Sequence, residues 1–435
     1  MPKSDTPPLP TSALFGIVKP SGPSSMTVIN DLKRLVSASK IFMPERVAME
    51  NAKDLYREGN DHDAGLRVDK KGREKGKWKK AKGKSRELEA KMGQGGTLDP
   101  LADGVLVVGI NKGTKRLSEF LDCIKEYRTT CLLGCETDTY DSEGAQVRTA
   151  PWRHVTRESI ENTLEKFSGS IQQTPPVFSA LKMDGKPLYE YAREGIPLPR
   201  PIERRQVTVH SIGLTHWIPG TDHSYDFPEK KFTDEEREKL EKALKGVELP
   251  PDAAIKDEPE SAAVEYSAEA SKDASVPSNG PEKKEKLAAE RPPAFVLSMR
   301  VSGGTYVRSI VHDLGHALGS AAHVVTLTRS KQGRFVLSPS TAVSTPIAAD
   351  AHSISTSASA PPETGPSEEV SSTVKEGTEA NADADADGKP EEVECVPWDI
   401  FARALENRAT EKADPDGWRE WEREVLQRLE VVESK

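Results

Sequence analysis

Two long polar tracts divide this chain and limit how much of it can enter a packed core. Residues 220–292 carry 19 acidic and 12 basic side chains, and residues 350–394 carry 12 acidic and 2 basic ones. Chain segments of this composition bury too little apolar surface to fold by themselves. We therefore expect one ordered domain at residues 14–340, with insertions at about residues 40–91 (basic) and 220–292 (acidic). Residues 341–394 are predicted to form a disordered acidic tether.

The formal net charge of −9 conceals a basic remainder. The two tracts contribute −7 and −10, so the other residues together carry about +8. Phosphate affinity depends on local positive charge rather than on the total, and a nucleic-acid partner is therefore compatible with this chain. The strongest positive run, residues 70–91, has 11 basic and 3 acidic side chains. It is either a solvated charged loop or an arm that follows a phosphate backbone.

Targeting features and cysteines indicate a compartment. No run approaches the roughly 20 apolar residues that a membrane-spanning helix needs, so no membrane partner is expected. Residues 1–13 resemble neither a secretory signal nor a transit peptide. The four cysteines contain no Cys-x-x-Cys pair, which argues against a disulfide scaffold and a structural zinc site. We expect a reducing intracellular location, with nucleus, mitochondrion and cytoplasm left open.

Short apolar runs alternate with helical patterns in the rest of the chain. Strands are predicted at residues 14–18, 106–110, 127–133, 207–209, 212–214 and 294–301, and helices at residues 28–36 and 306–318. A capping-box pattern from Thr233 to Glu236 begins another helix inside the acidic insertion. Residues 326–338 are expected to close the core, and residues 395–435 to form a short C-terminal helical segment. This mixture indicates an α/β fold of the mixed α+β kind.

One glycine-rich loop can hold a carboxylate at an exposed elbow. Gly95 and Gly96 permit backbone conformations that a side chain would block, and Pro100 fixes the φ angle that follows Asp99. Ordinary turns contain the same dipeptides, so the loop alone does not establish a site. Arg308 lies early in a predicted amphipathic helix, and its guanidinium could pair bidentately with a carboxylate across a cleft.

Five sequence blocks, in order along residues 14 to about 340, together resemble one enzyme family. They are Lys19-Pro20-x-Gly22-x-Ser24-Ser25; Gly95-Gly96-Thr97-Leu98-Asp99-Pro100-Leu101-Ala102-x-Gly104; Lys125-x-Tyr127-Arg128 followed by Gly134-x-x-Thr137-Asp138-Thr139-x-Asp141; Pro175-Pro176-Val177-Phe178-Ser179-Ala180-Leu181-Lys182; and Gly304-Thr305-Tyr306-Val307-Arg308. The pattern resembles the TruB-type pseudouridine synthases, and among them the stand-alone eukaryotic enzymes that modify the T-loop of transfer RNA.

This resemblance implies a fold and a reaction. The fold is an extended, largely antiparallel sheet flanked by helices, with a central RNA cleft. The reaction converts uridine to pseudouridine at position 55 of transfer RNA. By position, Asp99 is the nucleophile, Tyr127 stacks on the flipped base and takes part in proton removal from C5, and Arg308 pairs with Asp99. A carboxylate is ionised at neutral pH and needs no activating base. Attack on the ribose and elimination to a glycal both remain open.

The resemblance also assigns substrate-binding positions. Tyr306 and Leu327 would line the base pocket, and Lys19 of the first block is assigned to substrate binding as well. Gln94 stands where bacterial members generally carry His, and its donor and acceptor suit a role in ordering the RNA loop. Since the isomerisation involves no redox change and no external group, neither a metal nor an organic cofactor is expected.

Other polar residues receive a structural interpretation. His312 and His316 have metal-ligand spacing on a helix, but no convergent carboxylate or Cys is apparent, so no metal site is predicted. Cys131 and Cys135 are interpreted as buried structural thiols. A turn after a strand explains Asp141.

Two alternative functions use the same fold. The first is the RNA-guided, H/ACA-type synthase subunit, which needs partner proteins and a PUA domain, and no PUA pattern follows residue 340. The second is a non-catalytic RNA-binding or RNA-folding protein, which would be expected to lack Asp99, Tyr127 or Arg308. We therefore predict a monomeric enzyme that binds the T-arm of transfer RNA and has no obligate protein partner. Messenger RNA is left open as an additional target.

Overall fold

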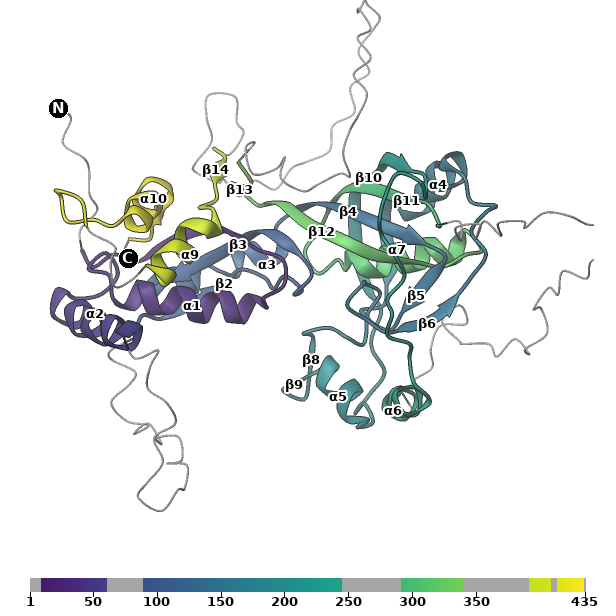
Figure 1. The fold of residues 1–435 in the computed structure, drawn as a ribbon, viewed down its shortest axis with the longest axis horizontal. Coiled ribbons are helices and arrows are strands. Elements are labelled where there is room, and N and C mark those ends of the chain that lie inside the picture. The colour runs from purple at the N-terminus through teal and green to yellow at the C-terminus, as the bar shows by residue number, and fades with distance from the viewer. Residues whose placement is uncertain (1–8, 61–88, 245–290, 339–390, 408–412, 434–435) are drawn as a thin grey trace, which may run out of the picture.

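The computed structural model describes residues 9–60, 89–244, 291–338, 391–407 and 413–433 (Figure 1). Most of the basic run at residues 70–91 lies outside the described residues. The same holds for the second half of the acidic insertion and for nearly all of the predicted tether. The described parts form a mixed α/β structure, which confirms the predicted fold class.

One 11-stranded, largely antiparallel sheet runs through the molecule. Its main path has the order β15-β1-β3-β12-β4-β11-β10-β7, and β2, β13 and β14 attach beside it. The contact between β3 and β12 is parallel. The strands of this sheet are β1 (Ala13–Lys19), β2 (Met92–Gln94), β3 (Asp103–Ile110), β4 (Lys125–Leu133), β7 (Gly169–Gln173), β10 (Arg205–Ile218), β11 (Ala294–Val301), β12 (Ala322–Gln332), β13 (Phe335–Val336), β14 (Val393–Glu394) and β15 (Glu430–Val431).

Helices gather around both ends of the sheet, and two strand pairs stand apart from it. In Figure 1, α1, α2, α9 and α10 surround the left end, α4 and α7 lie at the right, and α5 and α6 lie below. No helix in the described ranges is long and apolar enough to cross a membrane. The helices are α1 (Ser25–Ser37), α2 (Glu45–Asn60), α3 (Glu119–Asp122), α4 (Arg157–Leu164), α5 (Leu188–Glu194), α6 (Asp234–Leu244), α7 (Val307–Ala317), α9 (Trp398–Glu406) and α10 (Glu420–Arg428), with 3-10 turns η1 (Asn111–Lys115) and η2 (Glu165–Phe167). The small sheets pair β5 (Cys135–Thr137) with β6 (Gln146–Thr149), and β8 (Lys182–Met183) with β9 (Lys186–Pro187).

Helix α1 shows how local sequence positions an element. Ser24 caps it, because the Ser24 side chain accepts a hydrogen bond from the backbone N–H of Thr27. Val28, Leu32 and Leu35 recur at helical spacing and are all buried in the main core. The turn that precedes this helix is thereby fixed against the sheet, and it carries the first family-like block.

Two predicted boundaries differ from the structure. The basic insertion was expected to begin near residue 40, yet Ile41 and Phe42 are buried and α2 extends to Asn60. These apolar residues are consecutive and show no helical or strand period, which is why the pattern missed them. The runs at residues 207–209 and 212–214 belong to the single strand β10, which register shifts interrupt where it pairs with β11.

The C-terminal segment contributes strands as well as the predicted helices. Ala13 of β1 pairs with Val431 of β15, and the backbone N–H of Val396 donates to Gly16 at 2.9 Å. Trp421 and Phe401, from the two C-terminal helices, are almost completely buried. The strands β14 and β15 have two residues each, too few to produce a periodic signal in the sequence. The segment is therefore an integral part of the core.

Candidate active site

Asp99 lies in the loop that connects β2 to β3. The loop is tight: Gly96 has φ +130° and Gly104 has φ +101°, and a Cβ at Gly104 would lie 2.3 Å from the carbonyl oxygen of Arg329. Only glycine tolerates this combination of backbone angle and close approach. Asp99 itself keeps a third of its side chain exposed. The loop thus presents a carboxylate to solvent at a fixed point of the sheet.

The end of β1 and the start of α1 support this loop from one side. The Lys19 ammonium donates to the carbonyl oxygens of Ala102 at 2.6 Å and Pro100 at 3.2 Å. Ser25 Oγ donates to the Leu98 carbonyl at 2.8 Å. Burial lowers the pKa of Lys19 to about 8, although Asp103 and Asp99 oppose the shift. The first block therefore holds the loop. Lys19 is fully buried in this arrangement, and its assigned role in substrate binding stays a prediction.

Strand β12 supports the loop from the other side. Arg329 donates from Nε to the Val105 carbonyl at 2.7 Å and from Nη2 to the Gly96 carbonyl at 3.1 Å. Gln332 donates from Nε2 to the Gly95 carbonyl at 2.5 Å. Both side chains are buried. The sequence analysis did not predict these two residues, because the sequence around a buried polar side chain does not show which distant backbone groups it contacts.

Arg308 brings the first turn of α7 to the loop. Its Nε donates to Asp99 Oδ2 at 2.8 Å, and its guanidinium is almost completely buried. The expected bidentate pairing is wrong in detail: Nη1 donates to the Thr139 carbonyl at 2.5 Å, and Nη2 to the Phe178 carbonyl at 3.1 Å. Burial works against the charge of Arg308, yet Asp99 and Asp141 outweigh it and raise the arginine pKa. One nitrogen, Nε, orients Asp99, and the other two nitrogens fix the guanidinium.

Asp141 is a second carboxylate at this site. Its Oδ2 lies 3.7 Å from Arg308 Nε, and its Oδ1 accepts from the Thr139 hydroxyl at 2.6 Å and from the Glu143 backbone N–H at 3.1 Å. Burial raises the pKa of Asp141 to about 6, although Arg308 opposes the shift. The prediction of a turn accounts for the backbone of Asp141 but overlooked its contact with Arg308. The sequence did contain an indication of a role at the site, because Asp141 belongs to the same family-like block as Tyr127.

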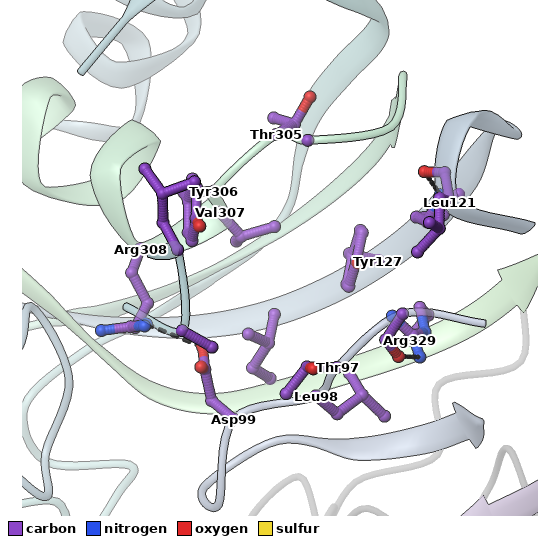
Figure 2. A pocket seen from close by; sticks show the side chains of 16 residues that line it. Thr97, Leu98, Asp99, Leu121, Tyr127, Thr305, Tyr306, Val307, Arg308 and Arg329 are labelled. Carbon is purple, nitrogen blue, oxygen red and sulfur yellow. Dashed lines mark hydrogen bonds and ion pairs between the residues drawn. The ribbon is translucent and has the colours of Figure 1, made fainter. Parts of the chain in front are cut away.

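A cavity of about 310 Å³ opens beside the Asp99–Arg308 pair (Figure 2). Tyr127, Tyr306 and Leu327, three of the predicted residues, line it together with Asp99 and Arg308. The volume is at the small end of the range for ligand sites, about 300–1,000 Å³, and suits a single nucleoside. The cavity therefore joins an accessible carboxylate, a buried cation and an aromatic ring, which suits nucleophilic chemistry on a stacked base.

Like Lys19, Gln94 is a predicted site residue that does not line the cavity. Its Nε2 lies 3.1 Å from the Thr97 hydroxyl, within the loop that carries Asp99. Its Oε1 is buried and has no hydrogen-bond partner in the described structure. The contact with Thr97 joins Gln94 to the loop, and the role of Gln94 toward RNA stays a prediction.

The structural interpretation of the thiols is confirmed, and that of the histidines needs correction. Cys131 and Cys135 are fully buried and free. A convergent carboxylate does exist for His312 and His316: Glu136 of β5 lies 3.2 Å from His312 Nε2 and 3.1 Å from His316 Nε2. Glu136 precedes these histidines by 176 residues or more, so their own helix gave no sign of it.

Comparisons with known proteins place these features in context. Residues 83–227 match the family described as TruB family pseudouridylate synthase (N terminal domain). The chain is 39% identical to tRNA pseudouridine synthase 4 of Schizosaccharomyces pombe, over 74% of this chain and 79% of the relative. It is 31% identical to pseudouridylate synthase TRUB1 of Homo sapiens, over 76% of this chain and 63% of the relative. Among solved structures, a chain in the crystal structure of a Cbf5–Nop10–Gar1 complex is 19% identical, with a TM-score of 0.32, over 74% of this chain and 49% of that one.

Proposed function

Because this chain belongs to the TruB family of pseudouridylate synthases, it is an isomerase that converts uridine to pseudouridine in transfer RNA, and we propose that its target is uridine 55 in the T-loop. One observation carries the assignment of the site. The carboxylate of Asp99 is held at 2.8 Å by a buried arginine, at the wall of a nucleoside-sized cavity that Tyr127 also lines. A uridine must leave the RNA stack to enter such a cavity.

The proposed mechanism begins at Asp99. One route is attack of its carboxylate on C1′ of the ribose, which breaks the bond between C1′ and N1 of uracil. The other is elimination to a glycal, in which a ribose proton is lost instead. In the first route C5 of the turned uracil displaces the Asp99 carboxylate from C1′, and in the second C5 adds to C1′ of the glycal while a proton returns to the ribose. In both routes the C5 proton is then removed with help from Tyr127, and N1 takes up a proton. Reactant and product are isomers, so the sum of the steps consumes no other reagent.

Partners and location extend the proposal. We propose uridines in messenger-RNA loops of T-loop shape as a second class of substrate, because the cavity accepts one flipped nucleoside and reads no long sequence. We also propose an intracellular location, in the nucleus, the mitochondrion or the cytoplasm, because four free cysteines suit a reducing compartment. We also propose that the chain works as a monomer without an obligate protein partner.

The test is modification of unmodified transfer RNA by the purified full-length chain. Asp99→Asn keeps the size of the side chain and removes its negative charge. We expect the wild type to form pseudouridine at position 55 and the variant to form none, with transfer-RNA affinity within about tenfold, or about 1.4 kcal/mol. Mapping of pseudouridine by chemical modification gives both the site and the yield. Turnover by Asp99→Asn would overturn the nucleophile assignment, and wild-type product at another position would overturn the T-loop assignment alone.

A further inference from the structure

Helix α7 carries a second cluster of functional side chains beyond Arg308. His312 and His316 follow Arg308 at intervals of four residues, so all three occupy one face of the helix. Glu136 of β5 faces the two histidines, with His312 Nε2 at 3.2 Å from Oε1 and His316 Nε2 at 3.1 Å from Oε2. One nitrogen of each ring and one Glu136 oxygen lie within 4.8 Å of one another. The cluster is largely shielded from solvent.

Hydrogen bonding alone leaves this cluster without a satisfactory neutral arrangement. His312 Nδ1 lies 3.0 Å from Asp313 Oδ1, so in a neutral ring the single proton on Nδ1 leaves a lone pair on Nε2 directed at Glu136. His316 Nε2 lies 3.1 Å from both a Glu136 oxygen and Arg148 Nη2, and one nitrogen cannot accept from one and donate to the other at once. A cation between the rings and Glu136 removes the first conflict, as a second proton on His312 also would, and it removes the second when Arg148 turns away.

We propose that Glu136, His312 and His316 bind a divalent metal ion, with Zn²⁺ as the preferred ion. Two imidazoles and one carboxylate form a common zinc ligand set. Tetrahedral bonds of about 2.0–2.1 Å put ligand atoms about 3.4 Å apart. The two histidine Nε2 atoms lie 3.2 and 3.1 Å from different oxygens of Glu136, and one ligand atom from each residue lies within 4.8 Å of the others. Asp313 completes the pattern, because a metal-bound histidine usually donates its other N–H to a carboxylate.

Arg148 is the competitor for this site. Its Nε donates to Glu136 Oε2 at 2.7 Å, and its Nη2 donates to the Ser320 carbonyl at 3.3 Å. Its side chain is 38% exposed, so it can turn into solvent when an ion binds. The guanidinium lies against Glu136 and 3.1 Å from His316 Nε2, so it takes up part of the space of an ion bound there and repels its charge. We therefore expect moderate metal affinity in the wild type and tighter binding when Arg148 is replaced.

The metal would act on the structure of the catalytic site and not on the substrate. The ring of Tyr140 stacks on His312, with 3.9 Å between ring centroids. The preceding residue, Thr139, accepts a hydrogen bond from Arg308 through its carbonyl oxygen. An ion that joins β5 to α7 would therefore hold this turn against the helix that carries Arg308.

The experiment measures metal binding directly, without RNA. Full-length protein, freed of any purification tag and stripped with a chelator, is titrated with Zn²⁺ against a chromogenic competitor. We expect one equivalent to bind. Arg148→Gln should bind at least about tenfold more tightly, and Asp313→Asn about 10–100-fold more weakly. His312→Gln and His316→Gln should lose the site, whereas His210→Gln, a change of an exposed histidine on β10, should match the wild type.

Two further readouts separate a metal site from an ion-pair network. Co²⁺ should give the visible absorption of a tetrahedral site in the wild type and not in His312→Gln. Zn²⁺ should raise the thermal midpoint of the wild type, since a ligand that binds only the folded state stabilises it. Arg148→Gln and Asp313→Asn change partly exposed side chains, so these two variants should still fold and give a metal affinity even if the histidine variants unfold. Binding below a tenth of an equivalent, or equal affinity in all variants, would overturn the proposal and leave the cluster as a network of protonated histidines.

Discussion

At the scale of single residues, the site depends on how Arg308 distributes its donors. One donor reaches Asp99, and the other two reach the Thr139 and Phe178 carbonyls. The ammonium of Arg308→Lys cannot reproduce this planar fork. We expect its rate of pseudouridine formation to fall by about 100-fold or more, as for the loss of a positioned donor in other active sites. Single-turnover assays on transfer RNA measure this rate, and filter binding should show affinity within about tenfold of the wild type.

Arg300→Lys is the matched control for this substitution. Arg300 is half-exposed on β11, 4.0 Å from Glu126, and does not line the cavity. Its replacement should leave the rate unchanged. A rate for Arg308→Lys close to that of Arg300→Lys would mean that the guanidinium is dispensable for orienting Asp99.

Asp141 provides a prediction about pH and stability. Burial raises its pKa from 3.8 to about 6, so the folded protein binds this proton more tightly than the unfolded chain does. The free energy of unfolding should therefore fall as pH rises from about 4 to about 6. The size of the effect is on the order of 3 kcal/mol. Urea unfolding at pH 4.5 and pH 7 should show that the free energy of unfolding falls less in Asp141→Asn than in the wild type. An identical fall would show that the Asp141 proton is not linked to folding.

The residues differ in how visible they were in the sequence. Asp99, Tyr127 and Arg308 could be predicted because each belongs to a block whose pattern is itself unusual, and the cavity brings them together. Glu136 and Arg329 could not, because their partners lie far along the chain and are mostly backbone carbonyls or rings on another element. Such long-range contacts depend on the tertiary fold, so a local sequence pattern cannot predict them.

At the scale of elements, the loop between β2 and β3 owes its shape to supports on both sides. Arg329 is one of these supports, and because it also lines the cavity, its contribution to the loop is tested by stability rather than by activity. Arg329→Met keeps the length of the side chain but leaves the Val105 and Gly96 carbonyls without their buried donor. We expect a loss of about 2–5 kcal/mol in the free energy of unfolding, from two unsatisfied carbonyls. Chemical denaturation measures this loss.

Lys331→Met on the same strand is the control for Arg329. Lys331 pairs with Glu392 at the surface, and such a pair contributes about 0–1 kcal/mol. If both variants lost equally little stability, the loop would not depend on β12 for its conformation. The apolar run at residues 106–110 predicted β3, whereas residues 326–338 were expected only to close the core. Neither the strand β12 nor its parallel contact with β3, which brings Arg329 to the loop, could be predicted.

At the scale of the whole molecule, charge is unevenly distributed between the core and the polar tracts. The basic run at residues 70–91 lies almost entirely outside the described residues, so its role rests on its sequence. We expect replacement of Lys77, Lys79, Lys80, Lys82 and Lys84 by Ala to lower transfer-RNA affinity and to flatten its salt dependence. Each lost phosphate contact should reduce the slope of log affinity against log salt by about 0.7 to 0.9. Binding assays at several salt concentrations measure both quantities.

The modified position should stay the same in this variant, because the cavity around Asp99 reads the flipped base. Replacement of five exposed lysines outside this run by Ala, at Lys53, Lys115, Lys166, Lys239 and Lys242, provides the control for total charge. Unaltered affinity and slope would identify the run as a solvated loop. A shift of the modified position would show that the run helps to select the target.

The pairing of β15 with β1 has a consequence for synthesis of the protein. The ribosome makes β1 first among the described strands and β15 last, yet Ala13 and Leu14 pair with Val431 and Glu430. While the chain is being translated, this edge of β1 stays unpaired, and the pockets for Trp421 and Phe401 stay unfilled. The nascent protein therefore exposes a strand edge and apolar surface until its final helices emerge. Substitutions in residues 391–433 should therefore increase the need for chaperones during translation before they lower catalytic activity.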